Sequence, residues 1–547
     1  MHFLDFFLLY FGFLLIYDAE QSFGSWIQPV NYSAAIGNSS NLLKEERLES
    51  AFLLRYTNVE NKGSHIKIVV IDRNRGREMY KIDFQKPIHI HFIGIGGISM
   101  SGLAEILIDR SFPISGSDMK ASDITGHLTN IGARIAIGQR AENITDDIDL
   151  VVYTAAIHED NEEFAAAKTK GIPMMSRAEL LGQIMDNYAR SIAVAGTHGK
   201  TTTTSMLTHI LLQGQMDPTV SVGGMLDRIG GNIRVGQSDV FLTEACEYTN
   251  SFLAFHPLYS IILNVEEDHM DFFKDIDDIK HSFHIFASQT APDGQIIING
   301  DMSHTADILA GLSQKVITFG LGADNDYTAK DISYDNEGNG SYTLVVRGEE
   351  IGRITLKVKG SHNIMNSLSA IACSRAIGLS MEQILAGLLS FTGTHRRFEY
   401  KGNIGDVIVI DDYAHHPTEI QATLNAAREY PHDKLWVVFQ PHTYTRTKAF
   451  LPQFAEVLSK ADHVILADIF AAREPDTGMV SSMDIVNLMK DTGCDVHYFP
   501  TFGEIEEYLL SHVKGHDLLI TMGAGDVVTI GEELLKKTAE KNRSDFS

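Results

Sequence analysis

The chain of 547 residues is poor in cysteine, and its three cysteines, Cys246, Cys373 and Cys494, form no C-x-x-C pair. This scarcity excludes a disulfide framework and fits a reducing compartment. Basic residues are also few, with 45 Lys and Arg against 71 Asp and Glu. The formal charge of -26 would repel nucleic acid and anionic membranes over most of the surface, so we expect no nucleic-acid partner.

The N-terminal region lacks a clear targeting signal. Phe6 to Tyr17 is an uninterrupted apolar run, but it is too short to span a membrane and has no Lys or Arg before it. From Asp18 to Arg77 the sequence shows no clear period. We therefore predict that Met79 is the biological start and that residues 1 to 78 are an extension outside the main fold, which need not be translated. A membrane anchor is the alternative.

No internal repeat or low-complexity tract interrupts the rest of the chain, and its 13 prolines are spread out. Short apolar strands alternate with amphipathic helices, which predicts an α/β fold with mostly parallel sheets. The length suits about three domains. Strands are expected at Ile88 to Ile93, Phe112 to Ser117, Leu150 to Tyr153, Ser191 to Ala195, Asp239 to Thr243, Ser260 to Leu263, Val407 to Asp411 and Lys434 to Phe439.

A glycine-rich loop follows the apolar run Ile192 to Ala195 and precedes a helix that contains Ser205 to Leu212. Such a turn directs backbone N–H groups and the positive end of a helix dipole at one small volume, which suits a polyphosphate. Lys200 would reach the outer phosphates and Thr201 a bridging Mg²⁺. Val194 replaces the first glycine of the general motif, and a turn that binds nothing is the alternative. The predicted ATP-binding loop consists of Gly196, Thr197, His198, Gly199, Lys200, Thr201 and Thr202.

A second glycine turn lies earlier, after the strand that ends at Ile93. It resembles a dinucleotide-binding turn, although Ser99 replaces the third glycine and Asp118 matches a ribose-binding acid only loosely. A diphosphate at the helix N-terminus is plausible, and NAD is one candidate. The residues of this predicted site are Gly94, Gly96, Gly97, Ser99 and Asp118.

Two loops at strand ends are rich in metal ligands. Glu244 opens one of them, and His269 lies in the other, between Asn264 and Asp271. Carboxylates and an imidazole beside a phosphate loop would bind Mg²⁺ and neutralise charge in phosphoryl transfer. Solvated acidic loops are the alternative.

The last third of the chain carries reactive side chains after its strands. Asn363 and Asn366 lie three apart on one helix face, suited to a purine edge, but a helix cap with a polar neighbour explains them nearly as well. Histidines and arginines at strand ends rarely serve packing. The candidate functional residues in this region are Arg397, Asp412, His415, His416 and Arg446. A domain boundary is expected just before Gly393.

Together these motifs resemble the Mur ligases of peptidoglycan synthesis. In order they read G-I-G-G-x-x-M-S-G, G-T-H-G-K-T-T-T, E-A-x-E, D-H-M-D, H-N-x-x-N, R-R-F, D-D-Y-A-H-H-P-T-E and Q-P-H-x-Y-x-R. The resemblance covers the chain from Met79 to its end, which is 547 minus 78 or 469 residues.

The resemblance implies a three-domain enzyme. Residues 1–78 would be the extension outside the catalytic fold, 79–188 a Rossmann-like UDP-sugar domain, 189–392 a central P-loop ATPase domain and 393–547 a Rossmann-like domain that binds ATP and the amino acid. The implied substrates are UDP-N-acetylmuramate and L-alanine, joined with ATP and Mg²⁺ through an acyl phosphate. The location would be cytoplasmic, without membrane attachment of the catalytic fold, and the protein a monomer or homodimer.

The family pattern also assigns roles to individual residues. Lys200 would contact the phosphates, Thr201 and Glu244 one Mg²⁺, and His269 a second. Adenine would meet His362, Asn363 and Asn366, while Arg397 and Asp412 would reach ATP; His415, His416 and Arg446 match positions near the incoming amino acid. Cys246 and Thr443 depart from the residues common in relatives, Asp and Arg, and receive no role.

Three rival functions remain at this stage. A recycling ligase that attaches a preformed tripeptide shares the ATPase core, but its first glycine turn resembles G-I-C-G-T-F-M-G rather than the sequence that begins at Gly94. An NAD-dependent dehydrogenase would leave the phosphate loop unexplained. A non-catalytic nucleotide or UDP-sugar sensor would have no use for both the metal ligands and the cluster of Asp412, His415 and His416.

Overall fold

The computed structural model describes residues 81–154, 156–270, 272–335, 338–472 and 474–545, together with 53–54 and 70–71; for 53–54, 70–71 and 541–545 it describes the backbone alone. The chain divides into two compact units, Met1–Met79 and Tyr80–Ser547. In the first, β1 (Leu53–Leu54) pairs with β2 (Val70–Ile71) in antiparallel fashion. The apolar run from Phe6 and the predicted start at Met79 lie outside the described residues.

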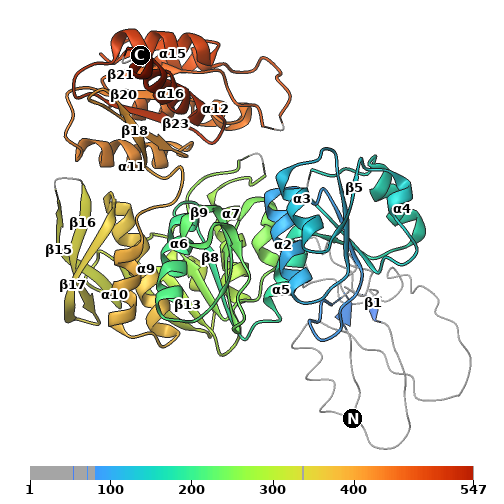
Figure 1. The fold of residues 1–547 in the computed structure, drawn as a ribbon. Helices are drawn as coiled ribbons and strands as arrows, with labels where there is room; N and C mark the ends of the chain where they lie inside the picture. The colour runs from blue at the N-terminus through green and yellow to red at the C-terminus, as the bar shows by residue number, and fades with distance from the viewer. Residues whose placement is uncertain are drawn as a thin grey trace, which may run out of the picture. The chain divides into compact units, whose positions relative to one another are not determined.

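Three sheets form the second unit, each flanked by helices (Figure 1). The first has five strands in the order β5-β4-β3-β6-β7, all parallel. Its strands are β3 (Ile90–Ile93), β4 (Ile114–Asp118), β5 (Arg134–Ile137), β6 (Leu150–Tyr153) and β7 (Met174–Ser176). Its helices are α2 (Ile98–Asp109), α3 (Asp123–Asn130), η3 (Ala141–Asn143), α4 (Glu162–Lys170) and α5 (Arg177–Met185).

The second sheet has ten strands in the order β10-β9-β11-β8-β12-β13-β14-β15-β16-β17. The run from β9 to β15 is parallel, and β10, β16 and β17 pair in antiparallel fashion. Its strands are β8 (Arg190–Ala195), β9 (Thr219–Leu226), β10 (Gly231–Arg234), β11 (Val240–Ala245), β12 (Tyr259–Ile262), β13 (Gln295–Asn299), β14 (Lys315–Gly320), β15 (Tyr327–Tyr334), β16 (Asn339–Val346) and β17 (Glu349–Lys359). The helices are α6 (Lys200–Gln213), η4 (Asp227–Ile229), η5 (Tyr248–Ala254), α7 (Ile276–Ser288), α8 (Thr305–Leu309), α9 (Ser361–Ala376) and α10 (Met381–Ser390).

The third sheet has six strands in the order β18-β19-β23-β20-β21-β22, and β18 is its one antiparallel member. The strands are β18 (Glu399–Ile404), β19 (Val407–Asp412), β20 (Leu435–Phe439), β21 (His463–Leu466), β22 (Asp495–Tyr498) and β23 (Leu518–Met522). The helices are α11 (Pro417–Arg428), α12 (Tyr444–Ala449), α13 (Leu451–Leu458), α14 (Ser482–Met489), α15 (Phe502–His512) and α16 (Val528–Asp545).

These sheets confirm the predicted α/β fold with mostly parallel strands. The strand predicted at Leu150 to Tyr153 has the same bounds in the structure, and the other predicted strands are recovered with shifted ends. Strand β18, which precedes the strand expected at Val407, was not predicted, and neither were several others, among them β5, β9 and β13. The predicted domain boundaries stay predictions.

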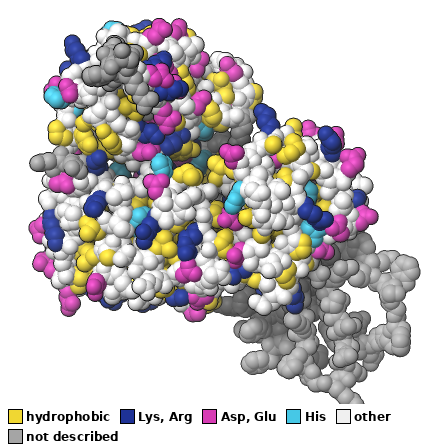
Figure 2. All heavy atoms as spheres, in the orientation of Figure 1, with side chains coloured by type: hydrophobic (Ala, Val, Ile, Leu, Met, Phe, Trp, Pro, Cys, Tyr) yellow, Lys and Arg dark blue, Asp and Glu magenta, His cyan; other side chains and the backbone are white. Residues whose placement is uncertain are grey.

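Clusters of buried apolar side chains pack the helices and strands of the second unit together. One cluster connects the first sheet to the second, with Phe92 and Leu181 on one side and Phe252 and Phe286 on the other. On the face shown in Figure 2, acidic and basic side chains are interspersed. Among the described residues, a helix long and apolar enough to cross a membrane is not found.

Helix α6, which begins at Lys200, packs closely against α10 at Gly387. A Cβ at Gly387 would lie 2.4 Å from Cα of Ile210, so even a methyl group requires one helix to move. We expect Gly387→Ala to destabilise the fold by about 1–3 kcal/mol, measured as a fall in the melting temperature.

A matched control is Gly126→Ala in α3, where a Cβ would meet no atom within 4 Å. Because alanine is the better helix former, that variant should be as stable as the parent or more so, by up to about 1 kcal/mol. Equal melting temperatures for the two variants would contradict close packing of α6 against α10.

Candidate active site

The phosphate loop begins where β8 ends and leads into α6. Gly196 and Gly199 have φ of +144° and +86°, a region that glycine adopts without strain, and Gly199 is the N-cap of α6. The segment after β12 braces this loop. The N–H of His198 donates to Oδ1 of Asn264 at 2.7 Å, and Nδ2 of Asn264 donates to the carbonyl of His198 at 3.0 Å. The loop therefore presents the N-terminus of α6 from a fixed backbone.

Lys200 points back into the loop. Its Nζ donates to the carbonyl oxygens of Gly196 and Thr197 and lies 2.9 Å from Oε2 of Glu247. Burial by itself would lower the pKa of Lys200, but the nearby acids, chiefly Glu247, hold it above its ordinary value. The ammonium group therefore stays charged beside the predicted phosphate site.

Two predicted magnesium ligands, Thr201 and Glu244, lie together. Oγ1 of Thr201 donates to Oε2 of Glu244 at 3.1 Å, and the N–H of Gly223 donates to Oε1 of Glu244 at 2.6 Å. Burial raises the pKa of Glu244. Burial disfavours the negative charge of Glu244, and a bound divalent cation would restore the charge balance. Mg²⁺ prefers oxygen ligands, so this hydroxyl and carboxylate fit it.

His269, the third predicted ligand, lies beside Glu247, the acid that also pairs with Lys200. Its Nε2 is 3.7 Å from Oε1 of Glu247 and 3.7 Å from Oδ2 of Asp268, and its ring stacks on Tyr248. Burial lowers the pKa of His269. The imidazole is therefore biased toward the neutral form, which is the form that binds metals.

A cavity of about 290 Å³ opens beside the loop. The predicted residues of α9 line it together with the phosphate loop and the start of the third sheet: His198, Gly199, Thr202, His362, Asn363, Asn366, Arg397 and Asp412. Nδ2 of Asn366 donates to Oδ1 of Asn363 at 3.0 Å. Gly360 caps α9 without any side-chain bond, so the alternative in which an asparagine caps this helix does not hold.

The polar walls of this cavity have shifted pKa values. Burial, together with the charge of Arg397, lowers the pKa of His362 to about 4. Burial raises the pKa of Asp412 to about 6, although its oxygens accept from the N–H groups of Phe398 at 2.8 Å and Ala414 at 2.7 Å. Near neutral pH the cavity therefore presents a neutral imidazole beside a guanidinium and a carboxylate.

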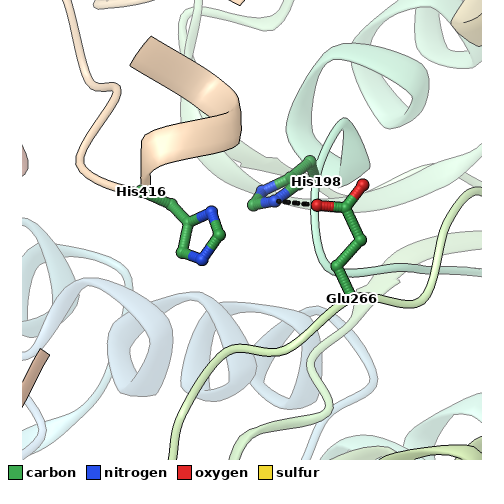
Figure 3. A group of neighbouring side chains, drawn as sticks. All are labelled: His198, Glu266 and His416. Atoms are coloured by element: carbon green, nitrogen blue, oxygen red, sulfur yellow. Dashed lines mark ion pairs between the residues drawn. The ribbon is translucent and has the colours of Figure 1, made fainter. Parts of the chain in front are cut away.

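The imidazole of His198 lies between two acids from different segments, of which Figure 3 shows Glu266. Its Nε2 is 3.5 Å from Glu266, and its Nδ1 is 3.3 Å from Glu419 of α11. Burial disfavours the charged ring, but the two carboxylates outweigh burial and raise the pKa of His198 to about 9. His198 is therefore a cation that holds the phosphate loop against α11.

His416 completes a trio with His198 and Glu266 whose ligand atoms lie within 4.8 Å of one another. Both ring nitrogens of His416 already have partners. Nδ1 accepts from the N–H of Thr418 at 3.3 Å, so Nε2 carries the proton and donates to the carbonyl of Glu267 at 3.1 Å. The trio is therefore better described as a polar contact between segments than as a metal centre.

Arg446 meets an acid rather than open solvent. Its guanidinium donates to Oδ1 of Asp268 at 2.9 Å, and it lies 3.1 Å from Nδ1 of His442. Burial opposes ionisation of Asp268, but Arg446 outweighs it and holds the pKa of this carboxyl well below its usual range. Thr443, to which the sequence assigned no role, accepts the N–H of Arg446 and caps α12.

The ring of His415 contacts two groups that are close to it in sequence. Its Nδ1 is 2.9 Å from the carbonyl of Tyr413 and 3.2 Å from Oε2 of Glu419. Burial lowers the pKa of His415 to about 4, so the ring is neutral at physiological pH.

The first glycine turn is distant in sequence from the phosphate loop, and a separate set of hydrogen bonds holds it. Gly94 has φ of +80°, and its N–H and that of Ile95 both donate to the carbonyl of Ser117 at 2.9 Å. The N–H of Gly96 donates to Oδ2 of Asp118 at 2.9 Å. Gly97 caps α2 and Ser99 is exposed in its first turn, so all five predicted residues meet at one helix N-terminus.

Sequence reasoning missed four acids of this site: Glu247, Glu266, Asp268 and Glu419. The first three lie in loops that were recognised as rich in metal ligands, and Glu419 closes a recognised motif. Their partners are distant in sequence, as in the pair of Asp268 and Arg446 at a separation of 178 residues. Loop composition could have indicated these acids, but their partners could not be read from it.

A parallel sheet that ends in a glycine loop with a lysine at the start of the next helix defines a P-loop nucleotide-binding protein. Family models match in three stretches: "Mur ligase family, catalytic domain" at residues 89–189, "Mur ligase middle domain" at 194–374 and "Mur ligase, glutamate ligase domain" at 396–525. The chain belongs to the Mur ligase family.

Curated relatives match the chain over their whole length. A UDP-N-acetylmuramate--L-alanine ligase of Agathobacter rectalis is 61% identical over 459 residues, which are 84% of this chain and 100% of the relative. A protein of the same name from Lachnospira eligens is 58% identical with the same coverage. Among solved structures, the UDP-N-acetylmuramate-alanine ligase of Thermotoga maritima aligns with a TM-score of 0.69 at 28% identity, covering 83% of this chain and all of that one.

The cationic state of His198 predicts a pH dependence of stability. Its folded pKa of about 9 exceeds the ordinary 6.5, so its contribution is fully present below about pH 6.5 and is lost as pH rises through about 9. We expect His198→Gln to lower the melting temperature at the acid end of this window and to have a smaller effect above it.

The exposed His281 provides the control, since His281→Gln should leave the melting temperature unchanged across the same window. A destabilisation by His198→Gln that is equal at both ends would contradict the charged state of His198.

Proposed function

We propose that this protein joins L-alanine to UDP-N-acetylmuramate at the expense of ATP, in the synthesis of the peptidoglycan precursor. The observation that carries the proposal is the full-length likeness to relatives named for that reaction. The phosphate loop with its charged Lys200 and the cavity beside it support the use of ATP. We extend the proposal to a cytoplasmic location, where UDP-sugars and ATP are available, and to a monomer or homodimer.

ATP is needed because a carboxylate is a poor electrophile near neutral pH. A carboxylate oxygen of UDP-N-acetylmuramate would attack the γ-phosphorus, the bond to the bridging oxygen would break, and ADP would leave. The amine of L-alanine would then attack the acyl carbon, lose a proton and expel inorganic phosphate. Lys200 would neutralise charge on the transferred phosphoryl group, and Glu247 would hold its ammonium in place.

Thr201 and Glu244 would hold one Mg²⁺ and His269 a second, and the two ions would supply charge neutralisation at the phosphates. In the cavity, His362, Asn363 and Asn366 would contact adenine, with Arg397 and Asp412 closing the ATP site. Gly94, Gly96, Gly97, Ser99 and Asp118 would hold the UDP-sugar.

His415, His416 and Arg446 would lie near the amino acid. Because Nδ1–H of His415 faces the carbonyl of Tyr413, its Nε2 is left as an acceptor suited to orienting an amine.

The proposal is tested by phosphate release from ATP in the presence of UDP-N-acetylmuramate and Mg²⁺. L-alanine should stimulate release strongly, whereas the tripeptide L-alanyl-γ-D-glutamyl-meso-diaminopimelate should not. Stimulation by the tripeptide alone would favour a recycling ligase, and no stimulation by either would favour a binding protein.

Lys200→Ala should lower turnover by about 100-fold or more, because it removes a charge that stabilises the phosphoryl transition state. Binding of UDP-N-acetylmuramate should be nearly unchanged, since its predicted site lies on the first sheet. Steady-state kinetics and calorimetric titration measure the two effects. Lys330→Ala, at an exposed position, is the control; turnover of Lys200→Ala within tenfold of the parent would remove Lys200 from the mechanism.

Glu244→Ala and His269→Ala should each raise the Mg²⁺ concentration required for half-maximal activity, because each removes a proposed ligand. Of the two variants, His269→Ala should impair acyl phosphate formation more strongly than Glu244→Ala does. Titration of activity with Mg²⁺ measures this requirement, with Cys246→Asp as an active comparison. An unchanged requirement in both alanine variants would rule out their assignment as ligands.

A further inference from the structure

The ring of His269 is held by a stacking contact rather than by hydrogen bonds. Its Nε2 lies 3.7 Å from Oε1 of Glu247 and 3.7 Å from Oδ2 of Asp268, distances that are too long for a hydrogen bond. Among the residues that the structure describes, no hydrogen bond reaches either ring nitrogen of His269. The ring instead stacks on Tyr248, with centroids 4.5 Å apart and planes inclined by 30°.

A histidine that binds a metal usually has a second partner. It donates its other ring N–H to a carboxylate, a carbonyl or a water molecule, and this bond fixes the orientation of the ring. Within the described chain, His269 has no such partner in the protein, so the face of Tyr248 is the contact that restrains its imidazole. Tyr248 follows Glu247 directly, and Glu247 pairs with Lys200, so the restraint is anchored at the phosphate loop.

The turn that carries His269 also supports Tyr248. The carbonyl of His269 accepts the N–H groups of Phe272 at 2.9 Å and Phe273 at 3.0 Å. The ring of Phe272 meets that of Tyr248 edge to face with centroids 6.2 Å apart, and the buried Phe273 packs on Phe272 in the same manner at 4.9 Å. A third aromatic ring therefore supports the stacked pair and ties it to the core.

The backbone at both partners of the stack is held in an unfavourable conformation. His269 has φ of +54°, and Thr249 and Asn250, directly after Tyr248, have φ of +53° and +56°. Residues with a side chain rarely adopt this left-handed region, and they keep it only where the surrounding contacts require it. The strain thus lies at the two points that set how the rings of Tyr248 and His269 meet.

We propose that Tyr248 is a positioning residue for the second Mg²⁺, because its ring holds the imidazole of His269 in the orientation in which it binds the metal. This inference rests on the proposed function. It concerns the face of the aromatic ring and does not require the hydroxyl of Tyr248. A stacked ring restrains an imidazole without competing for its lone pair, which stays available to a metal.

The test replaces Mg²⁺ by Mn²⁺, which takes similar ligands and is observed by electron paramagnetic resonance. Mn²⁺ is titrated into the full-length protein with UDP-N-acetylmuramate and the non-hydrolysable ATP analogue AMP-PNP. Pulsed measurements then detect the coupling of an imidazole nitrogen to Mn²⁺. The parent should show this coupling, and His269→Ala should lack it, which assigns the signal to His269.

Tyr248→Leu should lose the coupling that depends on His269 and should bind the second Mn²⁺ about 10- to 100-fold more weakly, the usual range for loss of a group that orients a metal ligand. Tyr248→Phe keeps the ring face and should retain both the coupling and the affinity within about twofold. Tyr248→Met, a second variant without an aromatic ring, should behave like Tyr248→Leu and takes its place if that variant does not fold.

A matched control is Tyr508→Leu. Tyr508 stacks on His512 in α15 with centroids 4.0 Å apart and planes inclined by 18°. Its loss removes a stacked tyrosine–histidine pair of the same kind from outside the proposed metal sites. Tyr508→Leu should therefore keep the coupling and the Mn²⁺ affinity of the parent, even if its melting temperature falls as much as that of Tyr248→Leu.

Two results would overturn the role of Tyr248. These are an unchanged coupling and Mn²⁺ affinity in the variants without a ring, or an equal loss in Tyr248→Phe, which would assign the effect to the hydroxyl. If the parent releases phosphate with L-alanine but shows no coupling that depends on His269, the proposed function stands and this inference fails. If the parent releases no phosphate with L-alanine, the proposed function fails and the inference fails with it.

Discussion

The arrangement of the site depends on the neutralisation of one buried cation, the ammonium of Lys200. The carbonyls of Gly196 and Thr197 accept hydrogen bonds from it, and Glu247 supplies the opposite charge from the end of a neighbouring strand. This is possible because β8 and β11 are adjacent and parallel, so that their carboxyl ends meet. The same adjacency brings Glu244 to Thr201, and the next strand, β12, brings Asn264 to the loop.

A second set of charges joins the third sheet to this edge. The cationic His198 is shared between Glu266 and Glu419, while Arg446 pairs with Asp268. Each set of contacts joins residues in or near the phosphate loop, His198, Glu266 and Asp268, to a residue that follows a strand of the third sheet. Removing one partner of a buried ion pair destabilises the folded protein. These contacts therefore fix where His415, His416 and Asp412 lie relative to the phosphate loop.

The sequence predicts the parts of this site that depend on local pattern. The phosphate loop and the glycine turn at Gly94 follow apolar strands and are marked by glycine spacing, and Glu244, predicted to bind a metal with Thr201, follows another apolar strand. The strand β18 was missed because Glu399–Ile404 is half exposed at the sheet edge and carries Gly402 at φ of +143°, so it has no apolar run. The pairing of Asp268 with Arg446 was missed because neither sequence neighbourhood indicates the other.

Arg446 shows how a buried arginine can serve the connection between segments in the free protein. Its guanidinium is held by Asp268 and His442, so its charge is already compensated. A compensated guanidinium must give up a partner before it can bind a substrate anion, which lowers its attraction for that anion. The charge balance of the free protein, rather than residue identity alone, therefore indicates that Arg446 contributes chiefly to holding the second and third sheets together.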